Sequence, residues 1–312
     1  MPKFFVVSDV HGYYDELMVA LDKAGFDKEN PDHWLIGCGD FFDRGKQPAE
    51  VMNFFLSLPR KVLIRGNHED LFQECLTRGY WMIHDTSNGT YYTICELGGA
   101  KFGRRFDDCC IIAENKTKFF FDSMVNYFET KNYIFVHGWI PVTNNDGLPK
   151  YYRHNRRFRF NPNWRHAHAS EWEQARWLNG MDMAQKGITE SGKTIVCGHW
   201  HCSYGHMLDS LETDDWISEF HDDAIWEPYY NDGIIAIDRC TAHTGEVNVL
   251  VIEDDFLEEN MTDKERLVQL FHDKERVIGG KEFGIADYMY AGVAEYLIEN
   301  GVTFTDKEKE GT

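Results

Sequence analysis

The chain has 312 residues, of which 43% are hydrophobic and 15% are aromatic. This length and composition are typical of one large α/β domain with a substantial core, and they exclude a largely disordered chain. The formal net charge is −20, so the protein repels nucleic-acid backbones and anionic membranes at long range. We therefore expect neither a nucleic-acid polymer nor a membrane as a partner.

The eight cysteines form no C-x-x-C pair and no zinc-ribbon spacing. They are predicted to be buried free thiols in a reducing compartment. The apolar run at 4–7 is too short for a signal peptide, and no stretch of about 18 apolar residues occurs. We expect a cytoplasmic protein.

Five short apolar runs predict buried strands in a mostly parallel arrangement. In chain order they are 4–7, 34–38, 61–65, 133–136 and 194–197. Helical patterns separate the early runs, at 15–24, at 48–58 and from Glu69 into the 120s. This alternation predicts an α/β fold.

Two later apolar runs, 234–237 and 247–252, flank a polar H-T-G-E segment and predict a hairpin. Residues 254–270 are strongly acidic, and 286–299 carry a helical pattern. We expect one compact domain at 1–255 with an inserted cap at about 145–190, and an acidic, helical C-terminal appendage at 256–312.

The segment G-I-T-E-S-G-K-T at 187–194 matches the phosphate-binding loop of nucleoside triphosphatases. That loop must follow a strand and open a helix. Here a helical pattern at 170–185 precedes the segment and a strand follows it. We interpret it as an ordinary turn.

Each of the five predicted strands is followed by polar side chains of kinds that bind metal ions. In chain order they are Asp9, His11, Asp40, Asn67, His68, His137, His199 and His201. Ligands gather outside the carboxyl ends of strands in α/β sheets. Residues two apart in an extended chain project to the same side, so Asp9 and His11 are expected to reach one ion together. The same reasoning applies to His199 and His201.

The motifs around these residues are S-D-V-H-G at 8–12, G-D-F-F-D-R-G at 39–45, R-G-N-H-E at 65–69, V-H-G at 136–138 and G-H-W-H at 198–201. Together they resemble the signature of calcineurin-like metallophosphoesterases. The second and third are most similar to the serine/threonine phosphoprotein phosphatase branch, with its bacterial and phage members and the symmetrical diadenosine tetraphosphate hydrolases. The resemblance implies a four-layer αββα fold, a β-sandwich flanked by helices.

The resemblance also implies a site for two divalent metal ions. Its ligands would be Asp9, His11, Asp40, Asn67, His137 and His199. Asp40 would bridge the ions. This thiolate-free set favours manganese, with iron or zinc as alternatives. His201 departs from the phosphoprotein phosphatase pattern, and we expect it to bind the first ion, beside Asp9 and His11.

Two such ions would share a hydroxide that attacks phosphorus in line. The resemblance implies that His68 protonates the leaving oxygen and that Asp43 orients its imidazole. Arg44 is the candidate for a bidentate hold on the phosphoryl oxygens. Glu69 is expected to support the loop of Asn67.

A basic, aromatic island at 150–165 stands out in this acidic chain. Its arginines are Arg153, Arg156, Arg157, Arg159 and Arg165. They are interpreted either as surface residues paired with carboxylates or as a cap that attracts an anionic substrate. Arg156 and Arg157 are candidate substrate-binding residues under the second interpretation, and the resemblance adds Arg176 as a second phosphate clamp.

We therefore predict a metal-dependent hydrolase of phosphate monoesters, similar to serine/threonine protein phosphatases. The alternative substrate is a phosphoanhydride, such as a dinucleoside polyphosphate, because both reactions need the same ions. A scaffold without catalysis is disfavoured, since such a protein is expected to lack His68 or several ligands.

Overall fold

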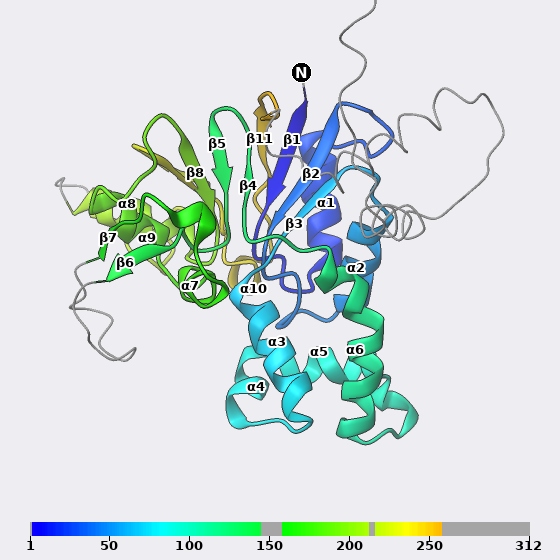
Figure 1. Ribbon diagram of the computed structural model, residues 1–312. Helices are drawn as coiled ribbons and strands as arrows, with labels where there is room; N and C mark the ends of the chain where they lie inside the picture. Colours follow the sequence, from blue (N-terminus) through cyan, green and yellow to red (C-terminus); the bar gives the residue numbers. More distant parts are fainter. Residues whose placement is uncertain (1, 145–157, 212–215, 258–312) are drawn as a thin grey trace, which may run out of the picture. The chain divides into compact units, whose positions relative to one another are not determined.

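The computed structural model describes residues 2–144, 158–211 and 216–257 (Figure 1). The chain divides into two compact units, Met1–Asp255 and Phe256–Thr312, and the fold described below is that of the first. Residues 145–157 of the predicted cap, with Arg153, Arg156 and Arg157, and the predicted helix at 286–299 lie outside the described residues.

Two mixed sheets form the centre of the first unit. The first has the order β11-β1-β2-β3 and the second the order β4-β5-β8-β10-β9. The strands of the first sheet are β1 (Lys3–Val7), β2 (His33–Cys38), β3 (Lys61–Ile64) and β11 (Leu250–Glu253). Those of the second are β4 (Phe128–Glu129), β5 (Tyr133–Phe135), β8 (Thr194–Cys197), β9 (Tyr229–Asn231) and β10 (Ile234–Ala236). The inner strands are parallel and the edge strands β11, β4 and β9 pair antiparallel.

The helices fall into two groups along the chain. The first group is α1 (Tyr14–Ala24), α2 (Pro48–Ser57), α3 (Asn67–Arg78), α4 (Ile83–Asn88), α5 (Thr90–Gly98), η1 (Ala100–Phe102) and α6 (Phe106–Asp122). The second is η3 (Trp164–His166), α7 (Ala169–Ala175), α8 (Gly180–Gln185), α9 (Cys202–Ser210) and α10 (Thr241–Thr244). A short antiparallel pair, β6 (Val142–Asn144) and β7 (Phe158–Phe160), lies between them in sequence.

The two sheets pack face to face, with helices on their outer faces (Figure 1). Side chains alternate along β1, so that Phe5 and Val7 pack with the helices of the first group. Phe4 points the other way, and its ring centroid lies 6.1 Å from that of Phe128 and 6.3 Å from that of Phe135 in the second sheet. The second sheet buries its other face under α7, α8 and α9. The predicted four-layer αββα fold is confirmed.

The five predicted strands occur where the apolar runs place them, but they divide between two sheets. The predicted late hairpin is wrong: β10 pairs with β8 and β9, whereas β11 pairs with β1. An apolar run indicates burial but not the partner strand. The helical stretch after Glu69 is interrupted at Gly79, Gly89 and Gly99, whose φ values of 71°, 96° and 75° end one helix after another.

The structure also tests the predictions for the segment 187–193, the cysteines and membrane-spanning helices. Residues 187–193 connect α8 to β8 as a turn, as the inverted context of the motif predicts. All eight cysteines are free, and six of them are buried. Within the described part of the chain, none of the helices has the length and apolar character needed to cross a membrane.

Candidate metal centre

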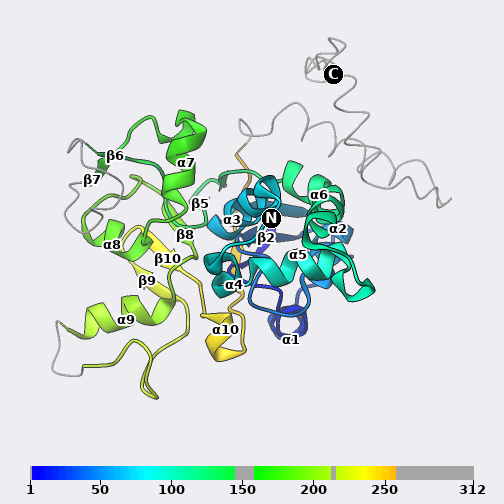
Figure 2. The ribbon, with the colours of Figure 1, turned by 90° about the horizontal axis from the view of Figure 1, so that it is seen from below.

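The predicted site residues lie in the loops that follow β1, β2, β3, β5 and β8. These loops meet at the carboxyl ends of the parallel strands, the edge that Figure 2 views from below. Glycines make the close approach possible: a Cβ on Gly66 would collide with Asp40 Oδ1, and one on Gly198 would collide with Ser8 and Asp9. The strand order therefore brings together side chains that are far apart in sequence.

The site loops have unusual backbone conformations. Of the seven non-glycine residues with positive φ in the described chain, six are predicted site residues. They are Asp9 (52°), His11 (50°), Asp40 (55°), Asp43 (72°), Arg44 (61°) and His199 (65°). The expectation that extended chain continues after Val7 and after Cys197 is thus wrong, because the left-handed turns redirect both loops. Such strained residues cluster at functional sites.

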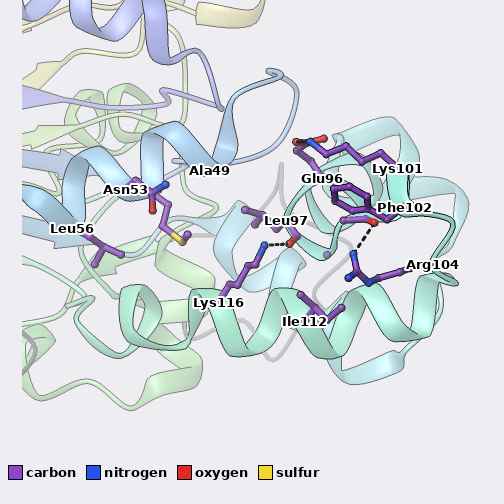
Figure 3. Close-up of a pocket in the computed structure, with 13 residues that line it drawn as sticks. Ala49, Asn53, Leu56, Glu96, Leu97, Lys101, Phe102, Arg104, Ile112 and Lys116 are labelled. Carbon is purple, nitrogen blue, oxygen red and sulfur yellow. Dashed lines mark hydrogen bonds and ion pairs between the residues drawn. The ribbon is translucent and has the colours of Figure 1, made fainter.

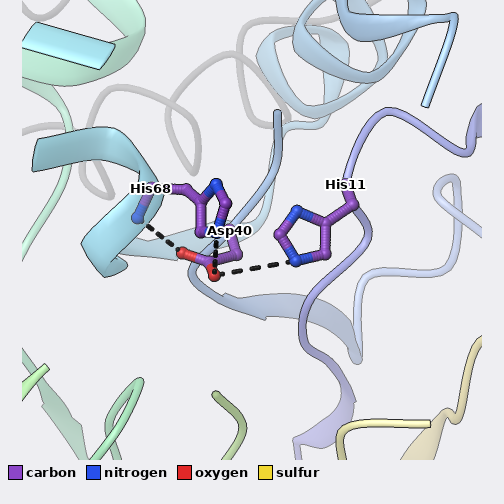
Figure 4. A group of neighbouring side chains, drawn as sticks. All are labelled: His11, Asp40 and His68. Atoms are coloured by element: carbon purple, nitrogen blue, oxygen red, sulfur yellow. Dashed lines mark hydrogen bonds and ion pairs between the residues drawn. The ribbon is translucent and has the colours of Figure 1, made fainter. Parts of the chain in front are cut away.

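His11, Asp40 and His68 form one group of possible metal ligands (Figure 4). Asp40 Oδ2 lies 3.7 Å from His11 Nε2 and 3.9 Å from His68 Nε2. His11 Nδ1 bonds the Phe42 carbonyl oxygen at 2.9 Å, but buried His11 Nε2 has no hydrogen-bond partner among the described residues. Burial lowers the pKa of His11 well below its ordinary value. A neutral imidazole with a free buried nitrogen fits a metal ion.

Asp40, His137 and His199 form a second group. His137 Nε2 lies 3.3 Å from Asp40 Oδ1 and 2.7 Å from Asn67 Oδ1. His137 Nδ1 bonds the Cys38 carbonyl oxygen at 2.8 Å, which orients the ring. The two oxygens of Asp40 therefore face different histidine groups. Burial raises the pKa of Asp40 well above its ordinary value, a cost that a bound cation would offset.

Asp9 lies beside the first group. Its Oδ2 accepts hydrogen bonds from the Ser8 hydroxyl and, at 2.9 Å, from the His199 backbone N–H. Its Oδ1 lies 3.9 Å from His11 Nε2. One oxygen of Asp9 is thus held by the protein while the other faces the unpartnered nitrogen of His11.

Glu69 joins two loops of the site, as expected. Its buried carboxylate accepts from the backbone N–H groups of Asp40 at 2.9 Å, Phe41 at 3.0 Å and Gly66 at 2.8 Å. These bonds fix the backbone on either side of the shared carboxylate of Asp40.

We expect Glu69→Ala to reduce the free energy of unfolding of the metal-free protein by roughly 3–5 kcal/mol, because three buried N–H groups lose a charged acceptor. Urea denaturation measures the change. Glu74→Ala, on the exposed face of the same helix, is the matched control and should change stability little. A Glu69→Ala loss no larger than that of the control would contradict the structural role.

His68 is oriented by a chain of hydrogen bonds. Its Nδ1 lies 2.8 Å from Asp43 Oδ2, and Asp43 in turn accepts from the hydroxyls of Thr90 at 2.7 Å and Thr93 at 2.9 Å. Arg44 Nη2 lies 3.2 Å from His68 Nε2. Burial alone would lower the pKa of His68, but the Asp40 carboxylate and the hydrogen bond to Asp43 outweigh it and raise the pKa. Sequence reasoning missed both threonines, which lie on α5 with no motif to mark them.

His201 belongs to neither group in the described part of the chain. It is the N-cap residue of α9 rather than part of a strand, and its Nε2 lies 2.6 Å from Glu219 Oε1. The geometric reason for making it a ligand, extended chain after Cys197, is therefore wrong. Binding of the first ion by its remaining nitrogen stays a prediction.

The described arginines of the cap region have carboxylate partners or lie on its surface. Arg176 is buried and pairs with Asp70 at 2.7 Å. Arg165 pairs with Glu129 at 2.5 Å and Glu190 at 3.3 Å, and Arg159 is exposed on β7. These contacts favour the surface and ion-pair interpretation for Arg165. A phosphate contact by Arg176 stays a prediction.

A further buried carboxylate was missed. Asp238 follows β10 and accepts from the Cys240 backbone N–H at 2.7 Å. Burial and the nearby Asp9 raise its pKa well above the ordinary value. The rule that found the other residues, a polar side chain directly after an apolar strand, would also have found Asp238 after the run at 234–237.

The sequence profile of the calcineurin-like phosphoesterases matches residues 2–203. The chain therefore belongs to that family, and the resemblance seen in its motifs is confirmed. It is 39% identical over 66 residues to a symmetrical bis(5′-nucleosyl)-tetraphosphatase of Hamiltonella defensa, covering 21% of this chain and 23% of that protein. It is 31% identical over 118 residues to serine/threonine-protein phosphatase PP1-delta of Caenorhabditis elegans, covering 32% and 37%.

A solved structure, the cold-active protein-tyrosine phosphatase of a Shewanella species, matches with a TM-score of 0.43 and 16% identity, over 81% of this chain and 76% of that one. The chain spans well under half the length of the two curated relatives named above.

Proposed function

We propose that this protein is a hydrolase that uses two divalent metal ions, with manganese favoured, to cleave phosphate monoesters. The observation that carries the proposal is the placement of the Asp40 carboxylate. Its Oδ2 faces His11 and His68, and its Oδ1 faces His137. A carboxylate between two groups of buried histidines suits a pair of ions. His199 and Asn67 complete the second group, and Asp9 the first.

Bound ions would supply an activated water nucleophile and neutralise charge on the phosphoryl group. His68 would donate a proton from Nε2 to the leaving oxygen, since its Nδ1 is held by Asp43. Its raised pKa favours the protonated form that such an acid needs. The Arg44 guanidinium, beside His68 Nε2, would hold the phosphoryl oxygens.

A second candidate reaction is the hydrolysis of a phosphoanhydride in a dinucleoside polyphosphate. The similarity to a bis(5′-nucleosyl)-tetraphosphatase, 39% identity over 66 residues, favours it. The scaffold alternative is disfavoured because the described residues include every expected ligand as well as His68 and Asp43.

Turnover of p-nitrophenyl phosphate with and without Mn²⁺ tests the proposal, and a panel with phosphopeptides and diadenosine tetraphosphate separates the two candidates. Absence of metal-stimulated turnover with every substrate would overturn the proposal. Preference for the tetraphosphate by more than about tenfold in kcat/KM would select the second candidate.

We further propose that residues 1–255 are the catalytic domain, with a cap at about 145–190, and that 256–312 are an appendage. The free cysteines support action in the reducing cytoplasm. The net charge of −20 supports small or protein-borne phosphate esters as substrates in preference to nucleic-acid polymers or membranes.

A further inference from the structure

The rings of Trp200, Phe220 and Trp226 lie around His201, and together with His243 they form what we call the aromatic shelf. The ring centroid of His201 lies 5.9 Å from Trp200, 4.7 Å from Phe220 and 5.9 Å from Trp226. The His243 ring, from α10, lies 5.3 Å from Trp226 and 6.1 Å from Phe220. Three separate segments of the chain therefore contribute to one aromatic surface.

The aromatic shelf begins at the candidate metal centre. Trp200 directly follows His199, a residue of the second ligand group, and the two ring centroids are 6.2 Å apart. Figure 2 shows α9 and α10 on the same side of the molecule as β9 and β10. A group bound on the shelf would thus lie next to a phosphoryl group held at the metal centre.

The shelf rings of Phe220 and Trp200 are open to solvent, and Trp226 is half-buried. Phe220 is 49% exposed and Trp200 is 37% exposed. Single exposed apolar residues are common on protein surfaces, but a contiguous exposed patch indicates a binding site. The exposed face of the shelf can take a flat ring by stacking or edge contact.

Hydrogen bonds hold the segment that presents these rings. Asp223 accepts from the Ser218 backbone N–H at 3.1 Å and from its hydroxyl. The Asn248 side chain donates to the Trp226 carbonyl at 2.8 Å. The Glu219 carboxylate meets His201 Nε2 at 2.6 Å. A surface fixed in this way loses little conformational entropy when a ligand binds.

The negative charge of residues 216–228 favours uncharged ligand groups over anionic ones. Residues 216–228 contain four acidic residues, Glu219, Asp222, Asp223 and Glu227, and no lysine or arginine. This surface repels phosphate, whereas the metal centre attracts it. The part of a substrate that suits the shelf is therefore an uncharged planar ring attached to the phosphate ester.

We propose that the aromatic shelf is a substrate subsite for a planar aromatic group of the leaving portion of the phosphate ester. This inference rests on the proposed function, because it places the ring next to the reacting phosphate. A nucleobase and the phenol ring of a phosphotyrosine share this chemistry.

A hollow elsewhere in the structure provides a control. It has a volume of about 690 Å³ and is lined by residues of α2, α5, η1 and α6, none of which belongs to the metal centre or the aromatic shelf (Figure 3). Its lining includes Phe102, which is 73% exposed. Two of its cations, Lys116 and Arg104, donate to the carbonyls of Leu97 and Gly99, and the third, Lys101, pairs with Glu96. Phe102→Ala therefore removes an exposed aromatic ring without touching the proposed subsite.

The test compares Phe220→Ala with the unaltered protein on phenyl phosphate and on glycerol 2-phosphate. We expect KM for phenyl phosphate to rise about 5–20-fold, the worth of one lost stacking contact, with kcat changed less than about twofold. KM for glycerol 2-phosphate should not change. Phe220→Tyr should restore the low KM, and Phe102→Ala should leave both substrates unaffected. Adenosine 5′-monophosphate and O-phosphotyrosine, run in parallel, distinguish a nucleobase from a phenol ring by the larger rise in KM.

Equal effects of Phe220→Ala on phenyl phosphate and glycerol 2-phosphate, or no effect on either, would overturn the subsite. Quenching of tryptophan fluorescence by adenosine or phenol measures binding without turnover. If no ester is hydrolysed but one of these rings quenches the unaltered protein and not Phe220→Ala, the proposed function fails and the shelf remains only as a binding site for an aromatic ring. If esters are hydrolysed and neither KM nor quenching depends on Phe220, the subsite fails alone.

Discussion

Asp40→Asn is expected to lose more bound metal than replacement of any other single candidate ligand. Asp40 contributes to both ligand groups, with Oδ2 facing His11 and His68 and Oδ1 facing His137. An amide offers one neutral oxygen where the carboxylate offers two charged ones, so one ion loses its contact with this side chain and the other keeps only a neutral ligand. Replacement of His11 or His199 by Asn should weaken the binding of one ion only.

Elemental analysis of the purified protein after exchange into metal-free buffer measures this effect. We expect about two ions per chain in the unaltered protein and fewer than about one in Asp40→Asn. Asp254→Asn is the matched control, because Asp254 is also buried but bonds Asn132, away from the metal centre. Near-stoichiometric metal in Asp40→Asn would remove the bridging assignment.

The positions of the metal-centre residues in the fold were predictable, because a simple rule relates their positions in the sequence to an edge of a sheet. A polar residue directly after a buried strand lies at the carboxyl edge of a sheet, and the structure places Asp40 and His137 there. The rule gives position but not conformation. Asp9 and His199 turn with positive φ, which no periodicity in the sequence reveals.

Contacts between distant segments were not predictable from the sequence alone. Thr90 and Thr93 support Asp43 from a helix almost fifty residues later, as their spacing of 47 and 50 residues shows. Glu219 reaches His201 from a loop without regular structure. The partners of β10 and β11 depend on the order of strands in two sheets, and single apolar runs carry no information on that order.

His68→Asn is expected to keep its metal ions but to slow turnover by roughly 10²–10⁴-fold, the usual contribution of a positioned acid. The backbone N–H of His68 donates to Asp40 Oδ1 at 3.0 Å, and this bond survives the substitution. The other candidate ligands, Asp40 among them, can therefore remain in place while the proton donor is lost. His84→Asn, at an exposed histidine of α4, is the matched control and should retain full activity.

The leaving group distinguishes an acid from a merely structural residue. Phenol and aliphatic alcohols need a proton as they leave, whereas p-nitrophenolate is stable without one, so the defect of His68→Asn should shrink for p-nitrophenyl phosphate. Measurement of kcat against the pKa of the leaving group, with metal content determined in the same samples, gives this comparison. Because Asp43 holds Nδ1, the proton must come from Nε2, which also lies beside Arg44. An equal loss of kcat for good and poor leaving groups, with both ions retained, would mean that His68 positions the phosphoryl group and that the proton comes from elsewhere.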